Sequence, residues 1–152
     1  ARVCGAKNVL SYEANPETIS LIEANHRLNA LHPRIRAKAI TATGGEITFF
    51  RNANIISSSV IERGDSEAIT VESDRLSDAI SDFRPTILLM DAEGAELELL
   101  PAADLSSLRG MVIETHAKIT GAESVDGLKN YLTEQGFQIV ADVNNNILCQ
   151  SA

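Results

Sequence analysis

Short apolar runs alternate with helical patterns in the first part of the chain. Residues 9–12 form a β-type run. Asn15 and Pro16 follow, a favoured N-cap and a favoured first helical residue, and apolar residues then recur at helical spacing until Pro33. Residues 35–40 predict the next strand. This order is typical of a β-α-β unit.

The same alternation returns further along the chain. Ser73 is predicted to cap a helix that ends before Pro85. The run at 86–90 is continuously apolar, which predicts a strand buried on both faces, and residues 111–113 predict another buried strand.

Between these two parts the pattern is different. Residues 41–72 contain three strand-like runs, at 46–50, 55–61 and 68–71, with no helical pattern between them. We interpret the segment as a β-rich excursion from the alternating fold.

At the end of the chain, residues 137–141 and 147–150 flank an asparagine-rich turn and predict an antiparallel hairpin. Together these patterns predict an α/β fold: an open Rossmann-like sheet, mostly parallel, with helices on both faces and an antiparallel C-terminal hairpin. No linker or repeat is visible, so we expect a single domain over residues 1–152.

Composition narrows the classes of function. The chain has 13 basic and 21 acidic residues, a net charge of −8, and no tryptophan, which disfavours nucleic-acid binding. No apolar run is long enough to cross a membrane, and no secretory signal is visible. The two cysteines, Cys4 and Cys149, form neither a disulfide framework nor a metal set, so we expect a cytoplasmic protein.

Charged residues follow three of the predicted strands. Glu13, Asp91 and Glu114 end these strands, and Glu93 and His116 lie two residues after Asp91 and Glu114. In open α/β sheets, ligands bind outside the carboxyl ends of the parallel strands. The five ionisable groups are therefore predicted to face one crevice.

Each of these residues also has a purely structural interpretation. Glu13 can act only in the approach to the following helix. Asp91, Glu93 and Glu96 can form the acidic first turn of a helix, favoured by the helix dipole, and for Glu96 we prefer this interpretation. His116 can be an ordinary surface histidine. For Asp91 we prefer a functional role, because a charge directly after four apolar residues is costly unless it faces a site.

Other chemistries have less support. Asp91, Glu93, Glu114 and His116 are possible metal ligands by type, but their spacing matches no recognised metal signature, so we expect no metal. The serines at 57–59 lack the context of a nucleophile elbow. The chain has no P-loop and no GxGxxG motif.

Several segments resemble the FkbM family of S-adenosylmethionine-dependent methyltransferases. Residues 89–100, LMDAEGAELELL, resemble the family segment I-D-x-E-G-A-E-x-x-x-L, and residues 12–16, YEANP, resemble F-E-P-N-P. The serine run at 57–59, residues 70–76 and residues 112–116, VIETH, also match. The resemblance covers nearly the whole chain.

The resemblance implies a class I methyltransferase fold and transfer of a methyl group from S-adenosylmethionine to a hydroxyl of a small molecule, sugar or glycan. By position, it implies that Glu13 holds the cofactor ribose with Asn15 beside it in the cofactor site. It also implies that Asp91, Glu93 and His116 are catalytic residues near the methyl group and the acceptor. A base within reach of the acceptor hydroxyl suits this chemistry, and His116 or a carboxylate can provide it.

One part of the family pattern has no counterpart. The first strand and its glycine-rich D-x-G-x-x-x-G loop would lie upstream of Ala1, and residues 1–8 resemble the end of the helix after that loop. We therefore expect an N-terminally truncated methyltransferase domain without its first strand. Two alternatives are a degenerate, non-catalytic methyltransferase-like binding module and another nucleotide-binding enzyme, such as one using a sugar nucleotide.

Overall fold

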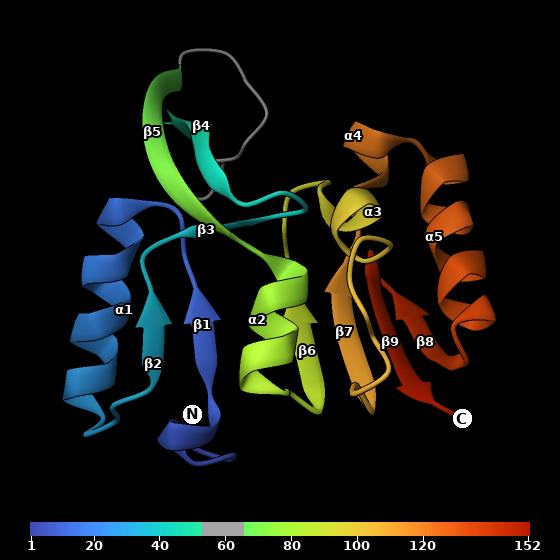
Figure 1. The fold of residues 1–152 in the computed structure, drawn as a ribbon, viewed down its shortest axis with the longest axis horizontal. Helices are drawn as coiled ribbons and strands as arrows, with labels where there is room; N and C mark the ends of the chain where they lie inside the picture. Colours follow the sequence, from blue (N-terminus) through green and yellow to red (C-terminus); the bar gives the residue numbers. More distant parts are fainter. Residues whose placement is uncertain (53–65) are drawn as a thin grey trace. The chain divides into compact units, whose positions relative to one another are not determined.

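The computed structural model describes residues 1–52 and 66–152 and contains both helices and several sheets (Figure 1). It divides into two compact units, residues 1–75 and 76–152, which are described separately below. The α/β class predicted from the sequence is therefore confirmed, while the single-domain interpretation stays a prediction. Among the described residues, no helix is long and apolar enough to cross a membrane.

The first unit begins with a β-α-β arrangement. A short 3-10 helix, Ala6–Asn8, leads into β1, Leu10–Tyr12, which pairs in parallel with β2, Arg34–Arg36. The connecting helix is α1, Pro16–Leu28. Its apolar spacing does not mark a core face, because Leu21 and Leu28 are exposed and no residue of α1 is buried.

A second sheet of the first unit has the order β3-β5-β4. β5, Ser66–Arg75, pairs in parallel with β3, Ala39–Thr41, and antiparallel with β4, Gly45–Asn52. The single strand predicted at 35–40 is thus two short strands in different sheets. The predicted strand at 55–61 and the serines at 57–59 lie outside the described residues.

Ser73 does not cap the next helix, contrary to the prediction. It is a residue of β5, where its buried hydroxyl donates to the Gly45 carbonyl at 2.9 Å and lies 3.1 Å from the Thr41 hydroxyl. The strand continues to Arg75, and the helix starts directly after it. A hydroxyl that is satisfied across the sheet is not available to a helix terminus.

The second unit contains one four-stranded sheet with the order β6-β7-β9-β8. β6 and β7 are parallel, whereas β9 is antiparallel to both β7 and β8. The elements of this unit are α2 (Leu76–Phe83), β6 (Ile87–Met90), α3 (Glu96–Leu99), β7 (Gly110–Glu114), α4 (Ala117–Thr120), α5 (Ala122–Glu134), β8 (Phe137–Val143) and β9 (Asn146–Ser151).

The predicted C-terminal hairpin is confirmed as β8 and β9. Asn144 and Asn145 both adopt positive φ values, 52° and 64°, which a tight two-residue hairpin turn requires and asparagine tolerates. The prediction of a mostly parallel sheet is not confirmed, because parallel and antiparallel pairs occur in both units.

Only one face of the second unit's sheet is buried. Met111, Ile113, Ile147 and Cys149 are almost fully buried, as are Val125, Leu128 and Leu132 of α5, which packs against β8. On β6, by contrast, Ile87 and Leu89 are 58% and 74% exposed. The prediction that this strand is buried on both faces is therefore wrong: within the described residues, side chains alternate between a covered and an uncovered face.

The core of the second unit can be tested with one pair of substitutions. Leu132→Ala removes a fully buried side chain and leaves a cavity, so we expect a loss of about 2–5 kcal/mol in the free energy of unfolding. Leu28→Ala, at a position 83% exposed on α1, is the matched control, and we expect a change within about 0.5 kcal/mol. Urea unfolding followed by circular dichroism measures both, and equal losses would contradict this assignment of the core.

Candidate functional site

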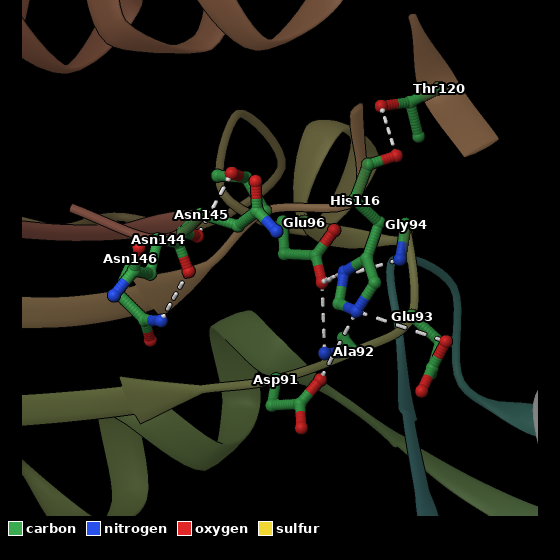
Figure 2. Close-up of polar contacts among 11 residues, drawn as sticks. Asp91, Ala92, Glu93, Gly94, Glu96, His116, Thr120, Asn144, Asn145 and Asn146 are labelled. Carbon is green, nitrogen blue, oxygen red and sulfur yellow. Dashed lines mark hydrogen bonds and ion pairs between the residues drawn. The ribbon is translucent and has the colours of Figure 1, made fainter. Parts of the chain in front are cut away.

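The carboxyl ends of β6 and β7 bring a group of ionisable side chains together. The two strands are parallel neighbours, with Met90 opposite Ile113, so the residues that follow them leave the same edge of the sheet. Asp91 follows β6 directly, and His116 is the residue before α4. Figure 2 shows that Asp91, Glu93 and Glu96 surround the His116 ring.

The two ring nitrogens of His116 have different partners. Nε2 lies 3.6 Å from Asp91 Oδ1 and 3.8 Å from Glu93 Oε2, while Nδ1 lies 3.1 Å from Glu96 Oε1. The imidazole is largely buried, with 14% of the side chain exposed, whereas 60% of the Asp91 side chain is exposed. One nitrogen therefore faces inward to a buried carboxylate, and the other faces two carboxylates nearer the solvent.

Glu96 is the centre of this arrangement. Only 1% of the residue is exposed, and its Oε1 accepts hydrogen bonds from the backbone N–H groups of Ala92 (2.9 Å) and Gly94 (3.3 Å), besides facing His116 Nδ1. A buried carboxylate requires such donors to offset the loss of hydration. Since Oε1 already acts as the acceptor for two backbone N–H groups, we infer that it also accepts from His116 and that the proton of this contact lies on Nδ1.

The loop between β6 and α3 is shaped to provide these donors. Glu93 and Gly94 have φ values of 52° and 105°, both in the left-handed region. Glycine adopts this conformation without strain, whereas for Glu93 it costs about 1–2 kcal/mol, which its surroundings must offset. The turn directs the Ala92 and Gly94 amides at Glu96 and places the Glu93 carboxylate beside His116.

The opposite side of the site is fixed by the β8–β9 turn. Thr115, which is buried, donates from its backbone N–H (2.7 Å) and its hydroxyl (3.0 Å) to the Asn145 carbonyl. The carbonyl of His116 in turn accepts from the Thr120 hydroxyl at 3.1 Å (Figure 2). The backbone on both sides of His116 is therefore anchored, which limits movement of the imidazole.

Part of this site agrees with the pattern of charged residues in the sequence. Asp91, Glu93 and His116 are brought together as predicted. Glu114 is the last residue of β7 and is not part of this cluster of possible metal ligands. Glu96, interpreted as an ordinary first-turn acid, is instead the buried partner of His116; it shares a helical face with the buried Leu99 and Leu100, which was the available signal.

Glu13 and Asn15 belong to the first unit and have defined local contacts. The Asn15 side chain accepts from the Glu17 N–H at 3.0 Å and caps α1, as predicted. The Asn15 N–H donates to Glu13 Oε1 at 2.7 Å, so Glu13 does lie in the approach to the helix. Their role in binding a cofactor stays a prediction.

A polar network supports the strand that ends beside Glu13. The Tyr12 hydroxyl donates to Asp74 Oδ2 at 3.1 Å, and Lys38 Nζ pairs with Asp74 Oδ1 at 2.8 Å and with Glu72. The hydrogen bond from Lys38 lowers the pKa of Asp74, and burial raises the pKa of Tyr12. These groups keep the end of β1 in place but are unsuited to proton transfer near neutral pH.

Comparison with known proteins gives one match. The family model described as "Methyltransferase FkbM domain" matches residues 1–139. Neither the search of curated proteins nor the search of solved structures gave a match.

The structural importance of Glu96 can be measured directly. Glu96→Ala leaves the Ala92 and Gly94 amides and His116 Nδ1 without their acceptor, so we expect a loss of about 2–4 kcal/mol in the free energy of unfolding. Glu98→Ala alters an exposed acid on the same helix and is expected to change it by less than about 0.5 kcal/mol. If chemical denaturation shows the two variants to be equally stable, Glu96 does not have this role.

Proposed function

The chain belongs to the FkbM methyltransferase family, and from this premise we propose that it methylates a hydroxyl group of a small molecule, a sugar or a glycan with S-adenosylmethionine as the methyl donor. The observation that carries the proposal is the group formed by Asp91, Glu93 and His116 at the carboxyl ends of two parallel strands. Ligands of open α/β sheets bind at such ends.

Glu13 is suited to hold the ribose of the donor. Its carboxylate follows β1, and one oxygen is fixed by the Asn15 N–H. The other oxygen has no hydrogen-bond partner among the described residues, and a carboxylate oxygen can accept from ribose hydroxyls. Asn15 contributes by fixing both Glu13 and the start of α1.

S-adenosylmethionine supplies an electrophilic methyl group when bound. The contribution of the chain is to orient the acceptor and to take its hydroxyl proton. His116 Nε2 lies 3.6 Å from Asp91 Oδ1 and 3.8 Å from Glu93 Oε2. An acceptor hydroxyl bound beside these three groups would therefore have a proton acceptor within reach. Glu96 keeps a proton on Nδ1, so that Nε2 is the ring nitrogen that can accept the hydroxyl proton.

Other properties of the chain agree with this function. A net charge of −8 suits an uncharged hydroxyl acceptor better than a nucleic acid. Burial raises the pKa of the Cys149 thiol, so this thiol is unreactive. Because both cysteines are free, we place the protein in the reducing environment of the cytoplasm.

Calorimetric titration of S-adenosylmethionine and its demethylated product into the chain tests the proposal. We expect micromolar binding that weakens about 10–100-fold in Glu13→Ala, because charged hydrogen bonds to the ribose are lost. Glu23→Ala, at an exposed position on α1, is the control and is expected to bind like the unaltered chain.

Two results would contradict the proposal. Absence of binding by a chain that is folded by circular dichroism would favour the alternative of a non-catalytic methyltransferase-like module. Equal affinities of the unaltered chain and Glu13→Ala would remove Glu13 from the donor site.

A further inference from the structure

We propose that Asp91, Glu93 and His116 bind one divalent transition-metal ion of the first row. The spacing of these residues in the sequence predicted no metal, but the fold brings one possible ligand atom from each within 4.8 Å of the others. The inference deepens the proposed function, because the ion would lie where the acceptor hydroxyl is activated. The binding of the ion itself does not depend on methyl transfer.

The distances fit a common ligand. Metal bonds to histidine nitrogen and carboxylate oxygen are about 2.0–2.2 Å long, so two donors on the same ion lie roughly 3–4 Å apart. His116 Nε2 is 3.6 Å from Asp91 Oδ1 and 3.8 Å from Glu93 Oε2. The three ligand atoms all lie within 4.8 Å of one another, and Asp91 is the most exposed of the three side chains, so it is the one with room to adjust toward an ion.

The environment of the second ring nitrogen supports a metal ligand. Histidines that bind metals donate their other N–H to a carboxylate or a carbonyl, which fixes the tautomer and the orientation of the ring. His116 has this partner in Glu96, which comes from α3, is almost fully buried and is itself held by the Ala92 and Gly94 amides. A surface ion pair requires no such buried support.

The charges and the openness of the group also suit a cation. The Asp91 and Glu93 carboxylates bring negative charge to the group, and within the described part of the chain His116 is the only ion-pair partner of Asp91. One nitrogen and two oxygen donors favour Mn²⁺, Fe²⁺, Co²⁺ or Zn²⁺ over Ca²⁺ and Mg²⁺, which prefer oxygen alone. Three protein donors leave positions open for water or a hydroxyl oxygen.

A metal ion here would change how the acceptor is activated. A hydroxyl on a divalent cation would lose its proton to solvent water at a much lower pH, and the cation would stabilise the negative oxygen without a base of matched pKa. His116 then acts as a ligand through Nε2, and Glu96 acts as a positioning residue through Nδ1.

The competing explanation makes a different prediction. If His116 is protonated on both nitrogens, its Nε2–H forms ion pairs with Asp91 and Glu93, and the group has no need of a cation. A protonated ring competes with metal, so this arrangement would bind cations weakly and without preference for a particular ion.

The test is titration of Mn²⁺ into the chain after treatment with a chelator, without S-adenosylmethionine, followed by calorimetry and by the electron paramagnetic resonance signal of free Mn²⁺. We expect one ion per chain, bound at least tenfold more tightly than Ca²⁺. Asp91→Asn and His116→Ala are expected to abolish the site, and Glu96→Gln to weaken it about 10–100-fold with the stoichiometry kept. Glu98→Gln, an exposed acid on α3, is the matched control.

The outcomes separate this inference from the proposed function. Absence of Mn²⁺ binding, equal affinity for Ca²⁺, or unchanged binding by Asp91→Asn would each overturn the metal site. None of these results depends on the donor, so a chain that binds Mn²⁺ but not S-adenosylmethionine supports the site and contradicts the methyltransferase proposal. A chain that binds S-adenosylmethionine but not Mn²⁺ supports the methyltransferase proposal and contradicts the metal site.

Discussion

The candidate site depends on the buried carboxylate of Glu96. One oxygen of this side chain is the common acceptor for two backbone amides of the loop after β6 and for Nδ1 of His116. Because the carboxylate is removed from water, each of these hydrogen bonds is costly to break. A single side chain thus fixes the shape of the loop, the tautomer of the histidine and the direction of Nε2.

The rest of the second unit places this carboxylate and its partners. Parallel pairing of β6 with β7 brings Asp91 and the approach to His116 to one edge of the sheet. Leu99 and Leu100, next to Glu96 on its helical face, are buried and hold α3 in position. The Asn145 carbonyl accepts a hydrogen bond from the Thr115 hydroxyl, which connects the β8–β9 turn to the backbone beside His116. The antiparallel hairpin therefore supports the site, although it contributes no ionisable side chain to the group.

Local signals in the sequence predicted much of this arrangement. The Asn15-Pro16 start of α1, the asparagine-rich turn and the charges after apolar strands all depend on neighbouring residues, and the structure agrees with them. The hydrogen bond between Glu96 and His116 and the cross-strand hydrogen bonds of Ser73 join residues 20 to 32 positions apart, so spacing along one element could not indicate them. The exposure of Ile87 and Leu89 could not be predicted either, because a continuous apolar run does not show which faces of a strand are covered.

The tautomer of His116 determines whether its Nε2 atom can accept a proton or bind a metal ion. Two-dimensional ¹⁵N–¹H correlation spectra of the imidazole, recorded on the chelator-treated chain above the pH at which the ring is protonated, distinguish a proton on Nδ1 from one on Nε2. We expect the Nδ1–H tautomer to predominate in the unaltered chain and in Glu98→Ala, and no longer to predominate in Glu96→Ala. A dominant Nε2–H tautomer in the unaltered chain would contradict this expectation, because His116 Nε2 would then be a donor and not the acceptor on which the proposed chemistry depends.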